Sequence, residues 1–317
     1  MTEIRYIDDI PFQRETVLTV GTFDGIHQGH IVLMNRLVQK ANKHNCRSVV
    51  VSFDPHPRSI IYAGDDGIRL LTTLEERSRH LSELGVDMLC VIPFTRDFSL
   101  QNSDEFVKNT LSNKIGLSYF IIGYDHHFGK NRDGNAQTLK KMSPHLDFEV
   151  EIVEKKEMGD LTISSTKIRQ FLEVHGDVIR AEELLGRPYS FEGVVVHGDE
   201  RGRTIGFPTA NIQPSHRDKL IPKEGTYVIF AQLDGNIFQG MMNIGNRPTF
   251  NGLNKCIEVH LFSFDKQIYG QTLRVFLIER IRDEKKFNSL IELVNQLKLD
   301  KKRSLKILER HGIKIIK

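Results

Sequence analysis

The chain reads Gly21-Thr22-Phe23-Asp24-Gly25-Ile26-His27-Gln28-Gly29-His30 directly after the apolar run at residues 17–20 and before an amphipathic stretch. This order predicts a strand, a glycine-rich turn and the start of a helix, a layout in which backbone N–H groups and a helix N-terminus can cradle a phosphate. His27 and His30 are three residues apart, so on a helix they would share one face and point at one ligand.

Zinc binding is the main alternative for this histidine pair, because solvated and metal-binding pairs with the same spacing are common. A zinc site would need further Cys, His or carboxylate ligands at metal spacing. Cys46, Cys90 and Cys256 are instead scattered singly along the chain. The pattern therefore favours nucleotide binding.

Length and charge limit the class of protein. With 317 residues, of which 39% are hydrophobic and 27% charged, the chain is long enough for two buried cores. A net charge of +3 gives no global field toward nucleic acid or an anionic membrane, and no apolar run reaches bilayer length. The unpatterned cysteines are typical of a reduced compartment. We expect a cytoplasmic enzyme of two domains that acts on small molecules, without nucleic acid or membrane partners, as a monomer or weak oligomer.

In the first half, short β-branched runs alternate with stretches of helical apolar spacing. We expect strands at residues 17–20, 48–53, 88–93 and 119–123, and helices at residues 30–45, 74–84 and 104–115. This alternation is typical of βαβ units, in which helices cover both faces of a parallel sheet. Ligands of such sheets bind beyond the carboxyl ends of the strands, where the loops at residues 21–30, 53–57 and 123–129 would meet.

A further motif, Ile163-Ser164-Ser165-Thr166-Lys167-Ile168-Arg169, opens a stretch with a helical apolar face. Ser164 or Ser165 is a natural N-cap for that helix. The motif is either a capped helix with two surface cations, or a second phosphate clamp in which hydroxyls, amides, Lys167 and Arg169 converge on a triphosphate. Residue spacing leaves both interpretations open.

A change in composition follows Leu185-Gly186-Arg187-Pro188 and predicts two domains, residues 1–185 and residues 186–317. In the second we expect strands at residues 191–197, 226–233, 237–243, 257–264 and 273–281. Asp234-Gly235 between two of these runs is a good hairpin signal. Short strands separated by turns predict a closed antiparallel barrel, followed by a helix near residues 289–299. The fold class is α/β, then β.

The chemistry of this half is concentrated in Gly198-Asp199-Glu200-Arg201-Gly202-Arg203-Thr204-Ile205-Gly206-Phe207-Pro208-Thr209-Ala210-Asn211. Its glycines and charged side chains suit a flap that closes over phosphates, although it is not a Walker motif. Thr209 and Asn211 place oxygen atoms on one side of an extended segment, as a Mg²⁺ ion shared with ATP would require. The alternative is a surface loop whose Thr and Asn bond to backbone groups.

Four motifs of the first half resemble, in the same order, the adenylyltransferase module of prokaryotic bifunctional riboflavin kinase/FAD synthetases, and more widely the HxGH-type nucleotidyltransferases. They are the stretch 21–30, Phe53-Asp54-Pro55-His56-Pro57, Gly123-Tyr124-Asp125-x-x-Phe128-Gly129 and the stretch 163–169. The resemblance implies a Rossmann-like domain that binds ATP through Gly21, Phe23, Asp24, His27, His30, Ser164, Ser165, Thr166, Lys167 and Arg169. It also implies flavin contacts from Asp54, His56, Asp125 and Phe128. His126 departs from the family pattern, which has an aromatic residue such as Phe there.

The resemblance implies a reaction in which an oxygen of the FMN phosphate attacks the α-phosphate of ATP and expels pyrophosphate. The protein then mainly aligns the reactants and stabilises charge. His27 and His30 would donate hydrogen bonds to the developing charge, since the attacking phosphate is already ionised and needs no base. Lys167 and Arg169 would hold the leaving phosphates.

Asp24 has two roles open to it at this stage. It would either orient the loop through its amides or bind a nucleotide hydroxyl. Asp54, His56 and Asp125 keep the same alternatives of a structural and a ligand-binding role.

Three motifs of the second half resemble the riboflavin kinase module. They are Gly206-Phe207-Pro208-Thr209-Ala210-Asn211, Asn243-Ile244-Gly245-x-Arg247-Pro248-Thr249-Phe250 and Glu258-Val259-His260. The resemblance implies that Thr209 and Asn211 accompany Mg²⁺ and ATP, and that Glu258 is the base. It also implies ATP contacts from Gly198, Arg203 and Gly206. A carboxylate suits the poorly nucleophilic ribityl 5′-hydroxyl, whereas on an outward-facing strand position Glu258 would be a solvated residue.

Neither predicted site has a strong hydrophobic signature for the isoalloxazine ring. Candidates for stacking are Phe128, Phe207, Phe250 and Phe264. Each of these positions is more often occupied by a core residue.

Two rival hypotheses remain at this stage. Another HxGH nucleotidyltransferase, which makes a nicotinamide or pantetheine nucleotide, would leave the barrel without a role. A regulator whose barrel senses flavin or binds single-stranded nucleic acid would need a basic groove with interleaved aromatic side chains, whereas Asp199 and Glu200 stand beside the cations of the flap. We expect a two-step enzyme. Its C-terminal domain would phosphorylate riboflavin to FMN with ATP and Mg²⁺, and its N-terminal domain would adenylylate FMN to FAD.

Overall fold

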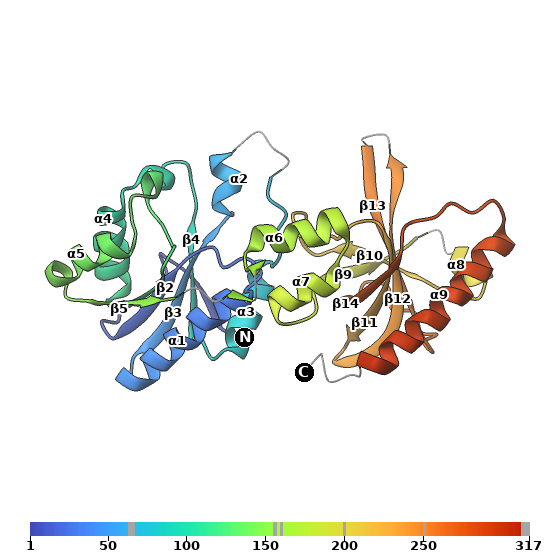
Figure 1. Cartoon of the computed structure of the whole chain (residues 1–317), viewed down its shortest axis with the longest axis horizontal. Coiled ribbons are helices and arrows are strands. Elements are labelled where there is room, and N and C mark those ends of the chain that lie inside the picture. Colours follow the sequence, from blue (N-terminus) through green and yellow to red (C-terminus); the bar gives the residue numbers. More distant parts are fainter. Residues whose placement is uncertain (63–66, 155–156, 159–160, 199–200, 250–251, 312–317) are drawn as a thin grey trace. The chain divides into compact units, whose positions relative to one another are not determined.

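The structure, a computed structural model, describes the chain apart from residues 63–66, 155–156, 159–160, 199–200, 250–251 and 312–317. The chain divides into two compact units, Met1–Ser165 and Thr166–Lys317. Figure 1 shows the first as a sheet flanked by helices and the second as a barrel with a long helix beside it. Asp199, Glu200 and Phe250 lie outside the described residues.

The first unit is built on a sheet of six strands in the order β1-β4-β3-β2-β5-β6, and every neighbouring pair is parallel. The strands are β1 Glu3–Tyr6, β2 Thr16–Val20, β3 Arg47–Asp54, β4 Met88–Pro93, β5 Leu117–Gly123 and β6 Glu149–Val153. The four expected strands are confirmed. The edge strands β1 and β6 are absent from the sequence prediction, because charged residues interrupt their short apolar pattern.

Helices cover both faces of this sheet. They are α1 Gln28–His44, α2 Pro57–Ile61, α3 Leu74–Glu83, η1 Phe98–Leu100, α4 Ser103–Glu105, η2 Phe106–Ile115, η3 Lys130–Arg132 and α5 Ala136–Leu146. A short hairpin of β7 Glu157–Met158 and β8 Leu161–Thr162 follows β6. The helix expected at residues 104–115 is confirmed as α4 and η2, but the turns of η2 are π-helical. Its buried Val107, Leu111 and Ile115 recur every four residues, which suits a turn wider than 3.6 residues.

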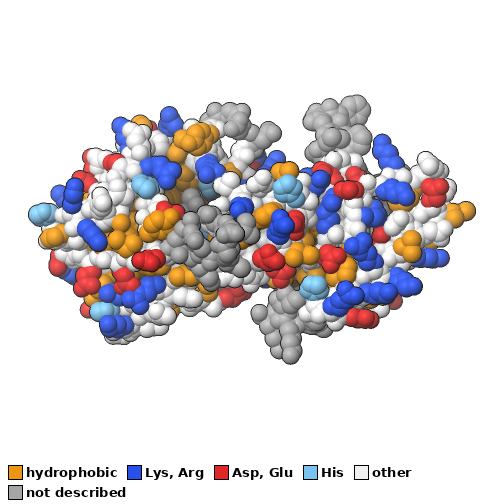
Figure 2. Space-filling view, viewed as in Figure 1, with side chains coloured by type: hydrophobic (Ala, Val, Ile, Leu, Met, Phe, Trp, Pro, Cys, Tyr) orange, Lys and Arg blue, Asp and Glu red, His pale blue; other side chains and the backbone are white. Residues whose placement is uncertain are grey.

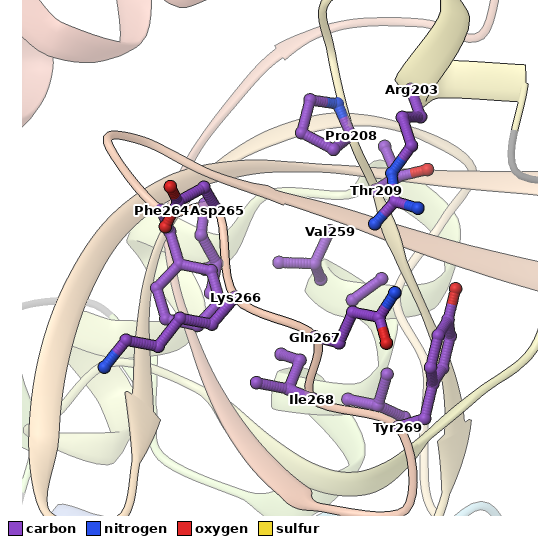
Figure 3. A pocket seen from close by; sticks show the side chains of 13 residues that line it. Arg203, Pro208, Thr209, Val259, Phe264, Asp265, Lys266, Gln267, Ile268 and Tyr269 are labelled. Atoms are coloured by element: carbon purple, nitrogen blue, oxygen red, sulfur yellow. The ribbon is translucent and has the colours of Figure 1, made fainter.

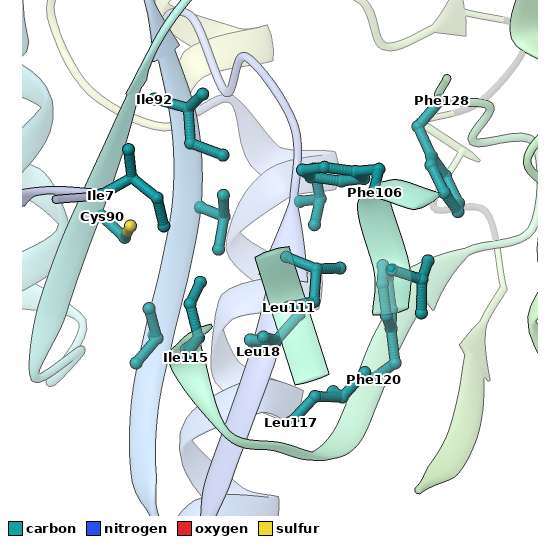
Figure 4. Close-up of a cluster of buried hydrophobic side chains, with 14 of the residues drawn as sticks. Ile7, Leu18, Cys90, Ile92, Phe106, Leu111, Ile115, Leu117, Phe120 and Phe128 are labelled. Carbon is teal, nitrogen blue, oxygen red and sulfur yellow. The ribbon is translucent and has the colours of Figure 1, made fainter. Parts of the chain in front are cut away.

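Two apolar clusters, one on each face of the sheet, form the core of this unit. Met34 of α1 and Leu81 of α3 share one cluster with Val50 of β3. Leu111 of η2 and Phe120 of β5 belong to the other, which Figure 4 shows. Burying such a side chain is worth about 1.5–3 kcal/mol, so both faces stabilise the sheet. Its carboxyl edge is a fixed frame for the loops.

The second unit opens with helices α6 Ser165–Gln170, η4 Phe171–His175 and α7 Val178–Leu185. A closed barrel follows, in which the strands neighbour one another in the order β10-β13-β12-β11-β14-β9 and all pairs are antiparallel. Its elements are β9 Ser190–Val196, α8 Arg201–Thr204, β10 Ala210–Pro214, β11 Gly225–Leu233, β12 Asn236–Thr249, β13 Gly252–Leu261 and β14 Thr272–Arg282. The expected barrel is therefore confirmed.

The hairpin expected at Asp234-Gly235 is also confirmed. Leu233 pairs with Asn236, and the two turn residues have positive φ angles of 47° and 78°, as a type I′ turn requires. Strand β10 is absent from the sequence prediction, because the segment is short and polar and ends in Pro214, and proline is rare inside strands.

Helix α9, Leu290–His311, extends well past residue 299, where the sequence pattern predicts its end. Ile307 near its C-terminus is buried in a cluster with Val228 of β11. Arg282 of β14 forms an ion pair with the buried Asp300 at 2.8 Å. Apolar and ionic contacts together fasten this helix to the barrel.

The boundary between the compact units, at residues 165 and 166, differs from the boundary predicted at residues 185 and 186. The segment between them comprises helices α6, η4 and α7, and α7 contacts β14 of the barrel. This helical segment therefore packs with the second unit. The boundary at residue 185 stays a prediction for the functional modules.

No helix in the described part of the chain is both long and apolar enough to cross a bilayer. On the visible face, Figure 2 shows Lys and Arg interspersed with Asp and Glu, with Lys and Arg more frequent near α9. The exposed cations of α9 are Lys298, Lys302, Arg303, Lys306 and Arg310. Helix α9 itself contains no Phe, Tyr or Trp.

The glycine after η2 generates a stability prediction. Gly116 has a φ of +98°, and a Cβ there would lie 2.1 Å from the backbone oxygen of Gln13. Since backbone atoms cannot give way cheaply, Gly116→Ala should lower the free energy of unfolding by about 3 kcal/mol or more.

Gly85→Ala is the matched control for this substitution. Gly85 has a φ of +80°, but its added Cβ would meet only Cγ1 of Val38, at 3.7 Å. The free energy of unfolding of the control should therefore fall only by the cost of placing Ala in a left-handed conformation, about 1–2 kcal/mol. Urea unfolding followed by circular dichroism measures both variants, and equal losses would contradict the prediction.

Candidate active sites

The loop between β2 and α1 has the strand-turn-helix form expected for residues 21–30. Phe23, Gly25 and Ile26 have positive φ angles of 46°, 88° and 38°, so the turn uses backbone regions that are costly for Phe and Ile. A Cβ on Gly21 would lie 2.8 Å from the ring of Phe23. Gly21 therefore lets this ring fold over the end of β2.

His27 and His30 stack on each other, with ring centroids 3.6 Å apart and planes inclined by 17°. His27 is the N-cap of α1, and its Nδ1 accepts a hydrogen bond from the backbone N–H of His30 at 3.3 Å. In a neutral ring this bond leaves the proton on Nε2, which can then donate to a ligand. The structure thus brings the two imidazoles together, as their spacing predicts.

Asp24 is fully buried, with 0% of its surface exposed. Its carboxylate accepts hydrogen bonds from the backbone N–H groups of Leu71 and Thr72, at 3.0 and 2.8 Å, and from the Thr72 hydroxyl at 3.1 Å. The same hydroxyl oxygen accepts the N–H of Gly25 at 2.9 Å. This geometry supports the loop-orienting role of Asp24, and its contact with a nucleotide stays a prediction.

A second buried connection reaches the loop from α3. Nη1 of Arg77 donates to the Ser52 hydroxyl at 2.7 Å, and that hydroxyl donates to the carbonyl oxygen of Thr22 at 3.2 Å. Burial lowers the pKa of the Arg77 guanidinium, and the charge of Asp24 opposes this shift. The loop is therefore held from inside the unit at both Thr22 and Asp24.

The motif at residues 163–169 reaches the loop through Ser165, whose hydroxyl donates to the carbonyl oxygen of Asp24 at 2.8 Å. Thr166, Lys167 and Arg169 belong to the second compact unit, on helix α6. Their predicted contacts with ATP phosphates, and that of Ser164, stay predictions.

A cavity of about 830 Å³ adjoins the loop at Gly21 and Thr22. Its wall is rich in aromatic rings, namely Phe53, Phe94, Phe98, Phe106 and Phe128, whose neighbouring centroids are 5.5–6.1 Å apart. Four cations also line it, Arg58, Arg96, Lys130 and Arg132. A planar aromatic ligand with an anionic group would suit this combination.

Among the residues expected to contact a flavin, Phe128 lines this cavity. His56 caps α2, because its Nδ1 accepts the N–H of Arg58 at 3.2 Å. Asp54 and Asp125 are exposed. For these last three residues the flavin contact stays a prediction.

His126, which departs from the family pattern, also lines the cavity. Its ring is stacked with that of Phe128 at a centroid distance of 6.3 Å. Its Nε2 is shielded from solvent and has no hydrogen-bond partner among the described residues. Burial lowers the pKa of His126 to about 4, so the imidazole is neutral near pH 7.

In the barrel, five neighbouring strands each contribute one polar side chain to a single row. The register pairs Arg282 with Thr226, Thr226 with Asn243, Asn243 with Glu258, and Glu258 with Asn211. Paired residues of neighbouring strands project to the same face, and all five line one cavity of about 400 Å³. Glu258 therefore faces a cavity, and the alternative of an outward-facing, solvated residue is wrong.

A smaller cavity, of about 240 Å³, shares Thr209 with the larger one. Figure 3 shows Arg203 and Thr209 on one side of it and Phe264 on the other. The larger cavity holds Asn211 and Glu258 together with Thr209. Two ligands, one in each cavity, could therefore meet at Thr209.

Glycines of the flap leave room for the two expected ligand residues. A Cβ on Gly198 would lie 2.0 Å from Nδ2 of Asn211, and one on Gly202 would lie 3.2 Å from Oγ1 of Thr209. Gly206 has a φ of +79° and no neighbour within 4 Å of an added Cβ. The direct contacts of Gly198 and Gly206 with ATP stay predictions.

Sequence reasoning missed several residues of these cavities. Thr226 and Arg282 were not identified, and Asn243 was only part of a motif, because their convergence depends on strand register. The cations of the first cavity were also missed. They follow β3, β4 and β5 at the carboxyl edge of the sheet, and that position was the available signal.

Two family models match the chain, one described as FAD synthetase over residues 9–167 and one described as riboflavin kinase over residues 185–308. Several curated relatives are named bifunctional riboflavin kinase/FMN adenylyltransferase. The Haemophilus influenzae protein is 40% identical over 284 residues, which cover 89% of this chain and 91% of the relative. The Bacillus subtilis protein is 36% identical, with 93% of each chain covered, and the Escherichia coli K12 protein is 37% identical, with 91% covered.

A solved structure has the same fold. The crystal structure of a Streptococcus pneumoniae protein named macrolide-efflux protein matches with a TM-score of 0.86 and 35% identity, and covers 95% of this chain and 98% of that one. Its name differs from the names of the curated relatives. Because family models match both halves and the relatives match over most of their length, the chain belongs to the family of bifunctional riboflavin kinase/FMN adenylyltransferases.

Proposed function

We propose that the riboflavin kinase module phosphorylates riboflavin to FMN and that the FAD synthetase module transfers the adenylyl group of a second ATP to FMN. The observation that supports the proposal is that, in each half, the loop expected to bind phosphate adjoins a cavity of matching chemistry. The histidine loop adjoins an aromatic and cationic cavity. Thr209 and Asn211 adjoin the cavity that holds Glu258.

In the adenylyl transfer, the isoalloxazine ring of FMN would lie against the phenylalanine wall, and its phosphate would lie near the cations. An oxygen of that phosphate attacks the α-phosphorus of ATP in line, the bond to the β-phosphate breaks, and pyrophosphate leaves. Nε2 of His27, protonated because Nδ1 is an acceptor, would donate to the developing charge together with His30. Lys167 and Arg169 would hold the leaving phosphates.

In the kinase reaction, riboflavin would occupy the larger barrel cavity and ATP the smaller one. Glu258 takes the proton of the ribityl 5′-hydroxyl while the hydroxyl oxygen attacks the γ-phosphorus of ATP. The bond from the γ-phosphorus to the β-phosphate oxygen breaks, and ADP leaves. Thr209 lines both cavities, which supports a position beside the transferred phosphoryl group.

Magnesium fits the residues where the two cavities meet. Thr209 and Asn211 offer neutral oxygen donors, the ligand type that Mg²⁺ prefers. Among the described residues, no group of three or more His, Cys, Asp or Glu side chains could hold a metal ion. ATP phosphates would therefore supply the remaining ligands and the negative charge, and the bound ion would neutralise the transferred group.

The proposed partners are all small molecules, namely riboflavin, FMN, FAD and ATP. We expect a cytoplasmic monomer or weak oligomer without nucleic acid or membrane partners. Cys46, Cys90 and Cys256 are free cysteines in the structure.

Product analysis tests the proposal. Purified protein is incubated with riboflavin, ATP and Mg²⁺, and the flavins are separated by chromatography. Formation of both FMN and FAD supports it, FMN alone refutes the N-terminal assignment, and neither product refutes the proposal as a whole.

Substitutions at the two sites should separate the two reactions. His30→Ala should slow FAD formation about 100-fold or more, because a donor to the developing charge is lost, and should leave FMN formation unchanged. Glu258→Gln should slow FMN formation about 100-fold or more and leave FAD formation from supplied FMN unchanged. Rates measured with riboflavin and with FMN as substrates distinguish them, and a folded variant that loses both activities equally would contradict the assignment.

The wall residue His126 should make stability depend on pH. In the unfolded chain its pKa returns to about 6.5, so between about pH 6.5 and pH 4 the unfolded chain binds the proton first and stability falls. His126→Phe restores the family's aromatic residue and removes this loss. On going from pH 7.5 to pH 5, it should lose about 1–2 kcal/mol less stability than the wild type.

The exposed neighbour His127 supplies the control, His127→Gln, which should follow the wild type. Urea unfolding at the two pH values measures all three proteins. Parallel losses in the wild type and His126→Phe would show that His126 is not kept neutral by burial.

A further inference from the structure

His260 connects β13, the strand that carries Glu258, to Pro208-Thr209-Ala210-Asn211, here named the PTAN segment. It follows Glu258 by two residues on β13, so both side chains project to the same face, and both line the larger barrel cavity. Only 6% of its surface is exposed. Nδ1 of His260 lies 2.8 Å from the carbonyl oxygen of Pro208, within hydrogen-bonding distance.

The rest of the imidazole has apolar surroundings. Nε2 is buried and has no hydrogen-bond partner in the described part of the chain. The rings of Phe207 and Phe262 lie 5.2 and 5.6 Å from that of His260, centroid to centroid. A buried nitrogen without a partner costs stability, and a phenylalanine would avoid this cost. The polar contact that this position uses is therefore the one to Pro208.

The protonation state agrees with this contact. Burial lowers the pKa of His260, the bond to Pro208 raises it, and the charge of Lys301 lowers it. A carbonyl oxygen can only accept a hydrogen bond, so the single proton of the neutral ring lies on Nδ1.

The contact matters because it lies beyond the end of the strand ladder. Strand β10 begins at Ala210, and its pairs with β13 are Ala210 with Val259 and Asn211 with Glu258. Thr209 precedes the ladder. Its position is therefore bounded by the backbone pairing of Ala210 on one side and by the His260 contact to Pro208 on the other.

We propose that His260 is a positioning residue of the kinase site, which fixes Thr209 relative to Glu258 by holding the carbonyl group of Pro208. The proposal rests on the proposed riboflavin kinase activity. His260 acts through the PTAN backbone. It thereby fixes Thr209, on the nucleotide side of the site, relative to Glu258, which lies on the same strand as His260.

Amide substitutions separate the two ring nitrogens. The amide nitrogen of Asn reaches about as far as Nδ1, and that of Gln reaches about as far as Nε2. His260→Asn should therefore keep the contact to Pro208 and stay within about threefold of wild-type kinase kcat/KM. His260→Gln and His260→Phe lose the contact, and both should lower kcat/KM for ATP by about 10–100-fold, the cost of a small misplacement of reacting groups.

The parameters that change identify a positioning effect. In His260→Gln and His260→Phe, KM for ATP should rise and kcat should fall, while FAD formation from supplied FMN should stay unchanged. Calorimetric titration with Mg·ADP gives a readout without turnover. The heat component that Thr209→Ala removes marks the kinase site, and it should weaken in the Gln and Phe variants but not in the Asn variant.

Each outcome decides the proposal. Unchanged kinase parameters in His260→Phe would overturn the role of His260 and leave the proposed function intact. Rescue by Gln but not by Asn would assign the role to Nε2 and overturn the proposal. If His260→Phe fails to fold, the Asn and Gln pair gives the same decision. A wild-type protein that forms no FMN overturns both the proposal and the function on which it rests.

Discussion

The glycine-rich loop at residues 21–30 keeps its shape because the carboxylate of Asp24 is buried and hydrogen-bonded to residues 71–72. Phe23 and Ile26 occupy left-handed backbone regions, which cost about 1–2 kcal/mol each, so the turn needs support from outside itself. Buried charge-assisted hydrogen bonds supply that support at a net value of about 1.5–3 kcal/mol each. The stacked histidines that begin α1 are placed by this turn, so their position depends on this buried network.

The barrel orders its site by different means. Strand register carries one polar side chain from each of five strands into the same cavity. It thereby brings Glu258 and Asn211 together, and the Cys256 thiol donates to both, at 3.5 and 3.7 Å. The PTAN segment leaves the ladder just before Ala210, and there a side-chain contact from His260 replaces backbone pairing. Both halves thus attach the segment that we expect to bind phosphate to a sheet, the first through a buried carboxylate and the second through strand register.

Local patterns were enough to predict most of the architecture. Strands β3 and β4 are continuous apolar runs, and Asp234-Gly235 specifies its own turn, so neither needs long-range information. β1 and β10 form only because a neighbouring strand pairs with them. The partners of Asp24 were unpredictable for the same reason, since residues 71–72 reach it only in the folded chain. His126 was recognised as a departure from the family, but its buried Nε2 and lowered pKa follow from packing around Phe128.

The central claim is that two separately supported loops form two independent nucleotide sites in one chain. Isothermal titration calorimetry with a non-hydrolysable ATP analogue, in excess Mg²⁺ and with flavin present, tests it most directly. We predict two equivalents bound per chain, one of which is lost in Thr209→Ala while the other is kept. A single equivalent in the wild type at saturation would contradict the account.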